Sequence, residues 1–321
     1  MTAPASTTRS SNTGSSDPGA AISGAAISGQ ERTATSRRSG PVGLLSLLFA
    51  FGLVAAACGS SDSAGGSDGA AGATASCDPL PTKVDGVLTV ATGEAVFPPW
   101  MEDDDPSSGK GFESALVYAL AEKLSVETIE WIGVGFDEAI APGEKDYDFN
   151  LQQYSITPDR DEVVDFSDGY YEVKQAIVGL EDSSVASAES ISELVEARLG
   201  AAIGTTSLDY IDAVIKPTTE AAVYDDNAAA KAALDAGQVD AVVFDLPTAY
   251  YVTAVEIPDA KILGVLPVAE SPEELGLLFE DGSPLVACVN AALAELKSDG
   301  TLDDLESEWL NQGGGIPVLA G

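Results

Sequence analysis

Hydrophobic residues from Gly86 onward alternate between short continuous runs and runs with helical spacing. Residues 87–91 form a compact, mostly apolar run typical of a buried strand, whereas Phe112, Leu116 and Leu120 recur on one face of a helix. We therefore expect strands at 87–91, 131–134 and 147–152 and helices at 112–124 and 136–141. Strands that alternate with helices are typical of parallel sheets with crossover helices, so the pattern predicts an α/β fold.

A second series of the same kind follows further along the chain. We expect strands at 199–203 and 239–244, a helix at 207–215 and a second helix ending at 236. Asp226 or Asn227 is suited to cap the start of that second helix, and Gly237 is suited to cap its end. Two similar series predict two similar lobes.

The last part of the chain is expected to form a strand at 275–279 and helices at 284–297 and 301–310. If the strand pairs with the first sheet, two segments cross between the lobes and act as a hinge. The expected division therefore places 78–175 and 271–321 in lobe 1 and 176–270 in lobe 2.

The N-terminal region has the pattern of an export signal. The uncharged run at 42–57 follows Arg37 and Arg38 and is shorter than the roughly 20 apolar residues that a spanning helix needs. We expect residues 1–57 to be a signal peptide with a long basic region, exported by either the general secretory or the twin-arginine route. An uncleaved anchor helix is the alternative.

The apolar run leads directly into Ala-Ala-Ala-Cys-Gly, which resembles the bacterial lipobox. This resemblance implies that Cys58 is the lipidated first residue of the mature protein. The residues that follow are small and polar, so 58–77 are expected to be a flexible tether. Cys77 and Cys288 remain, and an exported chain meets an oxidising compartment, so we expect them to form a disulfide, with two separate thiols as the alternative.

Charge and composition narrow the function further. The formal net charge of -37 disfavours contact with nucleic-acid phosphates. The chain contains no histidine, which removes the commonest metal ligand and general base, and we expect neither a metal nor another cofactor. Arg160 and Arg198 are the only arginines after the apolar run at 42–57, so few guanidinium groups are present to bind an anion.

Five fragments, in order, resemble the polar amino-acid family of periplasmic-type solute-binding lipoproteins of ATP-binding-cassette transporters (type II, bacterial family 3). They are GVLTVATGEAVFPPW, SITPDRDEVVDFSDGYY, IGTTSLDYI, YDDNAAAKAALDAGQVDAVVFD and CVNAALAELKSDGTLDDLESEWL. Together they span about residues 80–310. The resemblance implies a two-lobed periplasmic-binding-protein fold, with a mixed, mostly parallel sheet in each lobe and a two-segment hinge.

In that family, the arginine after a Ser-x-Thr-Pro segment binds the carboxylate of the ligand. Arg160 holds this place, and a guanidinium offers a carboxylate two parallel donors. Ser155, which begins the segment, is expected to contact the ligand as well. The alternative is a surface ion pair between Arg160 and the neighbouring aspartates at 159, 161 or 165. Thr205 and Thr206 match the second carboxylate contact, although one of them could simply cap a helix.

Asp245 matches the family aspartate that meets the ligand ammonium, with a turn cap as the alternative. Glu94 aligns with a family position that contacts the ligand side chain or amine, and Phe97 aligns with an aromatic that covers the ligand. Phe97 and Trp100 could equally be core residues. Three further polar or aromatic residues, Gln152, Gln153 and Tyr154, are expected to narrow the pocket. Gly111-Phe112-Glu113 is interpreted as an exposed helix start.

The resemblance implies a monomeric, non-enzymatic clamp for an amino acid, lipid-anchored at the outer face of the cell membrane. Its partners would be an ATP-binding-cassette permease and its ATPase. Because Glu94 and Asp245 are both acidic, a cationic or polar neutral amino acid is favoured over an acidic one. The alternatives are a dehydratase-like enzyme on the same fold, with paired carboxylates as acid and base, and a ligand sensor that docks to a receptor.

Overall fold

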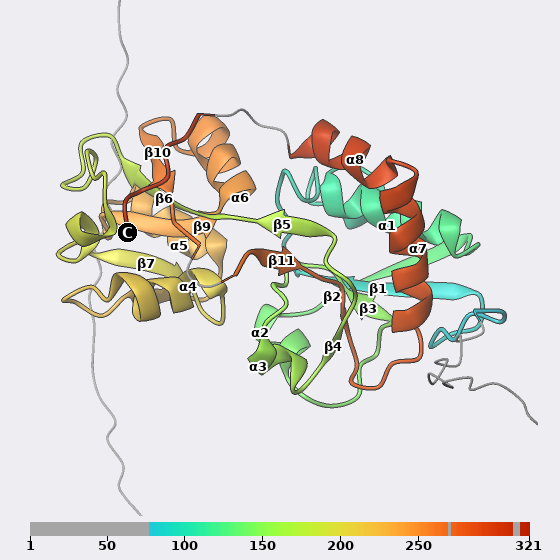
Figure 1. Ribbon diagram of the computed structural model, residues 1–321. Helices are drawn as coiled ribbons and strands as arrows, with labels where there is room; N and C mark the ends of the chain where they lie inside the picture. The colour runs from blue at the N-terminus through green and yellow to red at the C-terminus, as the bar shows by residue number, and fades with distance from the viewer. Residues whose placement is uncertain (1–76, 269–270, 311–314) are drawn as a thin grey trace, which may run out of the picture. The chain divides into compact units, whose positions relative to one another are not determined.

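The computed structural model describes residues 77–268, 271–310 and 315–321, which form two five-stranded sheets and the helices around them. The first sheet has the order β2-β1-β3-β12-β4 (Figure 1). Its strands are β1 (Val87–Thr92), β2 (Thr128–Gly133), β3 (Phe149–Asn150), β4 (Asp165–Phe166) and β12 (Leu278–Phe279). β1 pairs in parallel with β2 and β3, whereas β12 runs antiparallel to β3 and β4.

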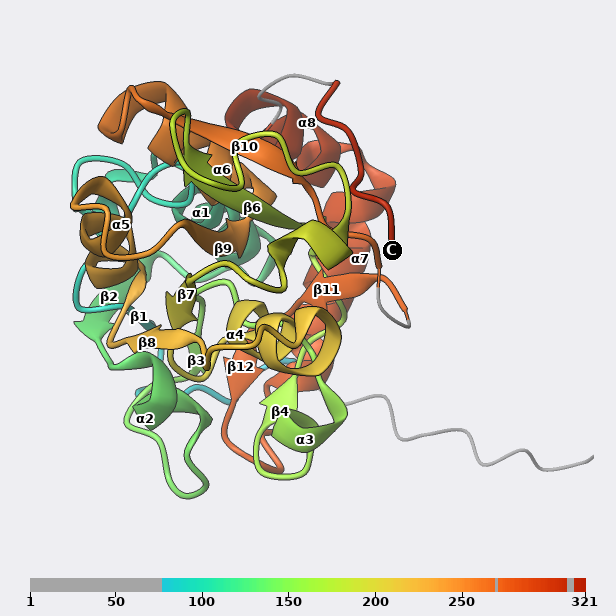
Figure 2. The same cartoon turned by 90° about the vertical axis from the view of Figure 1, so that its left-hand side faces the viewer.

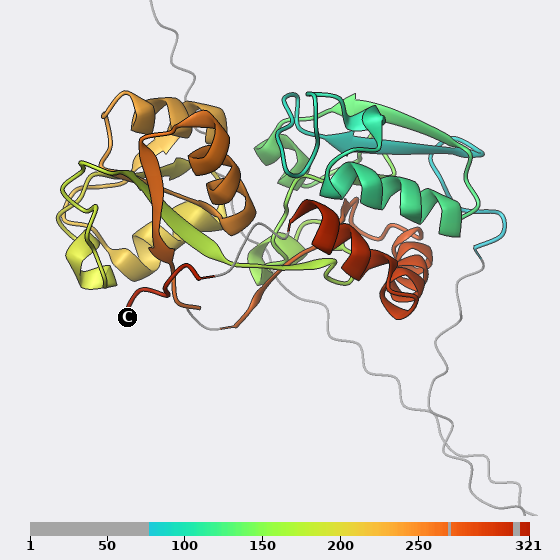
Figure 3. The same ribbon diagram turned by 90° about the horizontal axis from the view of Figure 1, so that it is seen from above.

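Three helices cover one face of the first sheet (Figure 3): α1 (Phe112–Lys123), α7 (Val286–Ser298) and α8 (Thr301–Trp309). Phe112, Leu116 and Leu120 of α1 are completely buried in the core that these helices share with β1 and β3. A smaller core lies around α2 (Phe136–Ile140), where Tyr154 and Leu278 are also completely buried. The short helices η1 (Pro106–Ser108) and α3 (Pro158–Asp161) complete this lobe.

The second sheet has the order β10-β6-β9-β7-β8 (Figure 2). Its strands are β6 (Gln175–Leu180), β7 (Leu199–Ala202), β8 (Ala222–Tyr224), β9 (Ala241–Asp245) and β10 (Ala260–Val265). Alternate side chains of the central strands enter two cores, so that Ile177 and Val243 lie in one and Val178 and Val242 in the other. Apolar residues on both faces explain why β6 and β9 are continuous hydrophobic runs.

The helices of the second lobe lie on both faces of its sheet. They are η2 (Ile191–Leu194), α4 (Thr206–Tyr210), η3 (Ile211–Ile215), α5 (Asn227–Asp235), α6 (Leu246–Tyr251) and η4 (Val252–Glu256). Asp226 caps α5, because its side chain accepts a hydrogen bond from the backbone N–H of Ala229 at 2.7 Å. Gly237 follows that helix with a φ of 66°, as expected for a C-terminal cap.

The two lobes repeat one topology. In the first sheet, β1 lies between β2 and β3 and is parallel to both, and β12, which comes from the other lobe, pairs antiparallel to β3. In the second sheet, β7 lies between β8 and β9 and is parallel to both, and β6, which comes from the first lobe, pairs antiparallel to β9. The prediction of two similar α/β lobes is therefore confirmed. The strands β6 and β10 of the second sheet are missing from the sequence prediction.

An antiparallel ribbon of β5 (Tyr171–Val173) and β11 (Glu273–Leu275) accompanies the two chain segments that connect the lobes. A further connection comes from the end of the chain. Leu319 packs in a core of the second lobe, and its backbone N–H donates a 2.9 Å hydrogen bond to the Val265 carbonyl. The C-terminal end of the chain lies beside this lobe (Figure 1). Residues 315–321 thus lie with the second lobe, whereas the sequence-based division assigned all of 271–321 to the first.

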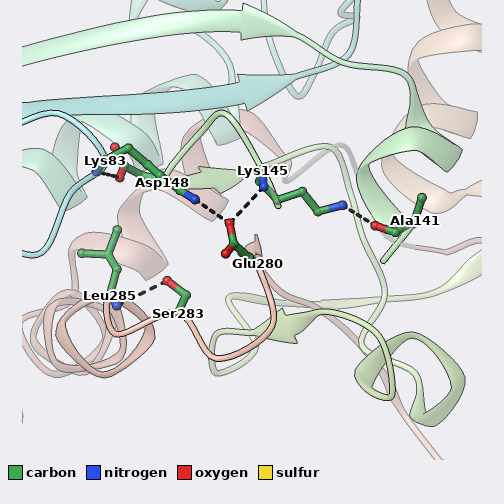
Figure 4. A network of polar contacts seen from close by, with 7 residues as sticks. All are labelled: Lys83, Ala141, Lys145, Asp148, Glu280, Ser283 and Leu285. Carbon is green, nitrogen blue, oxygen red and sulfur yellow. Dashed lines mark hydrogen bonds and ion pairs between the residues drawn. The ribbon is translucent and has the colours of Figure 1, made fainter. Parts of the chain in front are cut away.

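Covalent and polar contacts fix the entry of the chain into the first lobe. Cys77 and Cys288 form a disulfide, as predicted. Asp148 accepts hydrogen bonds from the backbone N–H groups of Lys83 and Thr89 at 2.6 and 2.7 Å. Figure 4 shows Glu280 between the Lys83 ammonium, at 2.5 Å, and the backbone N–H of Lys145, at 2.9 Å. The start of the described chain is thereby anchored to the segment before α7.

The predicted signal peptide at 1–57, the predicted lipidation site Cys58 and the expected tether up to residue 76 lie outside the described residues. Within the described part of the chain, no helix combines the length and apolarity needed to cross a membrane.

Candidate functional site

A cavity of about 400 Å³ is lined by residues of both lobes. Nine of the ten residues predicted to bind a ligand line it: Glu94, Phe97, Trp100, Gln153, Ser155, Arg160, Thr205, Thr206 and Asp245. The tenth, Tyr154, is completely buried behind the cavity wall, where its ring stacks on Phe136 with a centroid distance of 4.6 Å. Phe136 lines the cavity in its place.

Arg160 reaches this cavity from the short helix α3. Thr157 caps that helix by accepting a hydrogen bond from the Arg160 backbone N–H at 3.3 Å, and Pro158 begins it. The Arg160 guanidinium donates to the carbonyl oxygens of Ser155 at 2.7 Å and Gly204 at 2.9 Å, and lies 5.5 Å from the Phe136 ring centroid. Arg160 is only 8% exposed.

The surface ion pair considered for Arg160 is not formed. Among the described residues, no salt bridge joins its guanidinium to the carboxylates at 159, 161 or 165. Its positive charge interacts over longer distances with the carboxylates of Asp209, Glu273 and Asp245. Burial lowers the pKa of Arg160, which indicates that an anion bound beside it would be favoured.

Close approach of the backbone at Gly204 permits the contact with Arg160. Gly204 has a φ of 70°, and an added Cβ there would collide with the Asp137 carboxylate. A residue with a side chain would therefore be strained at this φ, and the Asp137 carboxylate would have to move away.

Asp245 lies on the opposite lobe, at the end of β9. It precedes α6 at the cap position, but its side chain makes no capping hydrogen bond. Instead, Asp245 Oδ1 accepts a 2.7 Å hydrogen bond from Gln175 Nε2. Burial, followed by the nearby charge of Glu273, raises the pKa of Asp245 to about 7, and the hydrogen bond from Gln175 acts in the opposite direction. A cation in the cavity would favour its ionised form.

The two threonines have different roles. Thr205 caps α4: its hydroxyl accepts from the backbone N–H of Leu208 at 3.2 Å and donates to the Ala202 carbonyl at 2.7 Å. Of the two alternatives considered for the threonines, Thr205 matches the helix cap. Thr206 directs its hydroxyl at Glu273 Oε1, at a distance of 2.6 Å.

Glu273 is absent from the sequence prediction. It lies on β11, outside the strand expected at 275–279, and its Oε1 accepts hydrogen bonds from the hydroxyls of both Thr206 and Ser155. Glu273 and Glu274 are adjacent in the sequence, and successive side chains of a strand point to opposite faces. One of the two carboxylates should therefore point inward, and this signal could have identified Glu273.

The interpretation of Glu113 as an exposed helix start is wrong, because Glu113 is completely buried. Its carboxylate accepts from Tyr170 Oη at 2.5 Å, from the backbone N–H of Gln153 at 2.9 Å and from the Gln153 side chain. Gln153 has a φ of 53°, an uncommon conformation that these contacts stabilise. Burial raises the pKa of Glu113 to about 7. Glu113 therefore shapes the cavity from beneath Gln153.

Trp100 is both a core residue and a residue of the cavity wall, the two alternatives that the sequence left open. It is 2% exposed and belongs to the core of the first lobe, yet it also lines the cavity. Its indole N–H donates a 2.9 Å hydrogen bond to the Thr248 hydroxyl of the second lobe. Trp100 is therefore a contact between the lobes as well as part of the cavity wall.

The cavity is acidic. Four carboxylate residues line it, and Arg160 is the only cationic residue among the described residues that do so. The carboxylates are those of Glu94, Asp225, Asp226 and Asp245. Such a surface attracts a ligand with positive charge and directs any anionic end toward Arg160.

The chain is similar in sequence to known proteins over most of its described length. The sequence model of the bacterial extracellular solute-binding proteins, family 3, matches residues 88–312. The L-cystine-binding protein TcyJ of Escherichia coli (strain K12) is 27% identical over 222 residues, which cover 67% of this chain and 80% of TcyJ. The L-arginine-binding protein of Pseudomonas aeruginosa is 27% identical over 233 residues, which cover 68% of this chain and 86% of that protein.

A solved structure shares the fold. An ancestral arginine-binding protein bound to glutamine superimposes with a TM-score of 0.60 at 32% identity, covering 70% of this chain and 98% of that one. The predicted two-lobed fold is confirmed by this likeness and by the paired sheets.

Proposed function

Because this chain belongs to the bacterial extracellular solute-binding proteins of family 3, we propose that it captures a cationic or polar neutral amino acid for import by an ATP-binding-cassette transporter. One observation carries the proposal: Arg160 of the first lobe and Asp245 of the second line the same cavity. A guanidinium suits the α-carboxylate of an amino acid, and a carboxylate suits its ammonium.

The mechanism is a clamp. The amino acid first binds the first lobe through Arg160 and the aromatic wall, and the second lobe then closes over it. The interlobe contacts of Arg160 with Gly204 and of Trp100 with Thr248 support a closed arrangement of this kind. Closure would create the surface that a permease and its ATPase recognise.

Charge supports a cationic or polar neutral ligand. With four carboxylate residues and one guanidinium at the cavity wall, an acidic side chain would face repulsion. Relatives named for arginine, cystine and glutamine support an amino-acid ligand in general.

Thermal-shift measurements on residues 77–321 with a panel of basic, polar neutral and acidic amino acids test the proposal. A ligand present at roughly a hundred times its dissociation constant stabilises the folded state by about 2.7 kcal/mol. We expect a shift with basic or polar neutral amino acids, none with aspartate or glutamate, and no shift for Arg160→Ala. A wild-type protein that no amino acid stabilises would refute the proposal.

Binding without chemical change belongs to the same proposal. The relatives reported above are named as binding proteins, which supports transport over catalysis. After prolonged incubation, the amino acid should be recovered intact from the denatured protein. Recovery of a dehydrated or otherwise altered product would favour an enzyme.

The lipid anchor at Cys58 and a location at the outer face of the cell membrane are part of the proposal, with the protein acting as a monomer. Support comes from the resemblance of Ala-Ala-Ala-Cys-Gly to a lipobox. In a bacterial host, the wild-type chain should incorporate labelled fatty acid and partition with membranes, whereas Cys58→Ala should do neither. Equal labelling of both chains would contradict the assignment.

A further inference from the structure

Glu273 lies on the strand β11, which leads the chain back from the second lobe to the first, and it contacts both lobes. Its Oε1 accepts a hydrogen bond from Thr206 Oγ1 of the second lobe at 2.6 Å and another from Ser155 Oγ of the first. The Ser155 and Thr206 hydroxyl oxygens lie 3.4 Å apart. Ser155 and Thr206 line the cavity, whereas Glu273 lies behind them.

The position of Glu273 determines how those two hydroxyls are oriented. A hydroxyl has a single proton to donate and lone pairs with which to accept. The carboxylate of Glu273 takes the protons of both Ser155 and Thr206. The sides of the two oxygens that face the cavity are then acceptors.

A second carboxylate adjoins this pair of acceptors. Gln175 is 5% exposed, and its side-chain amide donates to Asp245 Oδ1 at 2.7 Å and approaches Glu273 Oε2 at 3.3 Å. The other end of that amide accepts a 2.6 Å hydrogen bond from Ser207 Oγ, which fixes its orientation. Gln175 therefore holds Asp245 and Glu273 side by side while keeping their carboxylates separate.

We infer that Glu273 is a positioning residue for the ammonium group of the ligand, acting through Ser155 and Thr206, whose hydroxyls it turns into acceptors. The inference rests on the proposed amino-acid ligand. An ammonium group has three N–H donors and suits a wall made of two hydroxyl lone pairs and the Asp245 carboxylate. A carboxylate placed at the same wall would face only acceptors.

This assignment reverses the role expected for the Thr206 side chain. The family resemblance implied that Thr205 and Thr206 contact the ligand carboxylate, through free backbone N–H groups at the start of the helix or through a donating hydroxyl. While Glu273 holds the proton, the Thr206 hydroxyl cannot donate into the cavity, and Arg160 remains the donor for the carboxylate. The two ends of the ligand are thus separated by the polarity of the wall.

The test compares an amino acid with an analogue in which hydrogen replaces the α-amino group. Isothermal titration calorimetry would use L-arginine with δ-guanidinovalerate, and L-glutamine with glutaramate, against the wild-type protein and Glu273→Leu. Glu274→Gln is the matched control, because Glu274 is the next residue of β11 and its side chain is exposed. Absence of wild-type binding to any amino acid would refute the proposed function itself and not this inference alone.

We expect Glu273→Leu to lower the affinity for the amino acid by about tenfold or more, because a hydrogen-bonded group of the site loses its partner. The affinity for the deaminated analogue should change by less than about twofold. Glu274→Gln should leave both affinities unchanged. Equal weakening of the two ligands would indicate a general effect on lobe closure and would overturn the inference. An unchanged preference for the amino acid would overturn it as well.

Two further variants test whether Glu273 acts through the Ser155 and Thr206 hydroxyls or by direct attraction between its charge and the ammonium group. Glu273→Gln keeps an acceptor oxygen for the hydroxyls but loses the charge, so its loss should be smaller than that of Glu273→Leu. In a Ser155→Ala background, Glu273→Leu should cause a smaller additional loss than it does in the wild-type chain. Identical losses for Gln and Leu, or strict additivity with Ser155→Ala, would show that Glu273 does not act through the hydroxyls.

Discussion

Arg160 and Gly204 are joined by a 2.9 Å hydrogen bond that runs from a helix of the first lobe to a turn of the second. This bond uses one terminal nitrogen of the guanidinium, Nη2, and the Ser155 carbonyl accepts a hydrogen bond from the other, Nη1. The bound carbonyls orient Arg160 without neutralising its charge. A carboxylate in the cavity would provide the missing counter-charge and would complete the contact between the lobes.

Binding of an amino acid should release a proton from Asp245 near neutral pH. Burial and the charge of Glu273 raise the pKa of Asp245 to about 7, with Glu113 adding to the effect and Arg160 and Gln175 opposing it. A bound ammonium favours the ionised form, so affinity should fall as the pH decreases below about 7 and level off above it. Calorimetry in buffers of different ionisation enthalpy would measure the released proton.

Asp245→Asn is the control for that linkage. It removes the titrating group but keeps the size of the side chain, so binding should be weaker and should lose the proton release seen near pH 7. Retention of the full proton release by Asp245→Asn would assign the titration to another group.

Glu113 should make the folded protein less stable as the pH rises toward neutrality. Burial raises its pKa from 4.5 to about 7, so the folded chain holds this proton over a range in which the unfolded chain has lost it. The stabilisation is complete below about pH 4.5 and is lost as the pH rises through 7, a change of about 3 kcal/mol relative to Glu113→Gln.

Urea denaturation of wild-type protein and Glu113→Gln between pH 4 and 8 would measure this difference. Glu122→Gln is the matched control, because Glu122 lies on the same helix with an exposed side chain. Its stability curve should run parallel to that of the wild-type chain. Parallel curves for Glu113→Gln as well would show that the buried carboxyl does not titrate in this range.

The Cys77–Cys288 disulfide should contribute strongly to stability because it joins residues 211 positions apart. Closing a loop of that length restricts the unfolded chain, and its loss is expected to cost about 3–5 kcal/mol. The double variant Cys77→Ser, Cys288→Ser should therefore unfold at lower denaturant concentration than the oxidised wild-type protein. A midpoint that does not change would mean that the unfolded state gains little freedom when the bridge is absent.

The sequence predicts best those features that depend on residues close together along the chain. Phe112, Leu116 and Leu120 identify α1 because helical spacing is local, and the fragment that contains Arg160 identifies one side of the site through its family resemblance. The π-helical turn at Ile211–Ile215 was included in a predicted α-helix, since both have nearly the same hydrophobic spacing. Element types were therefore easier to predict than element ends.

Contacts between distant segments were not predictable in this way. Glu273 meets Ser155 and Thr206 only after two lobes have folded and approached, and no local pattern encodes that meeting. Glu113 has the local pattern of an acidic helix start, and its burial results from Tyr170 and Gln153. Leu319 joins the second lobe because the chain crosses once more after α8. Each of these contacts depends on tertiary packing.

Recognition of the ligand carboxylate by Arg160 is the central claim, and one comparison tests it most directly. Calorimetry would measure the affinity of wild-type protein and Arg160→Ala for the amino acid that binds best in the panel and for its α-carboxamide, which lacks the negative charge. Arg198→Ala, whose side chain forms an exposed ion pair with Asp240, is the control.

The wild-type protein and Arg198→Ala should prefer the free carboxylate by about a hundredfold, in line with the 2–5 kcal/mol typical of a buried charge pair, whereas Arg160→Ala should bind both forms weakly and without preference. An Arg160→Ala protein that still prefers the carboxylate by the wild-type factor would contradict the account.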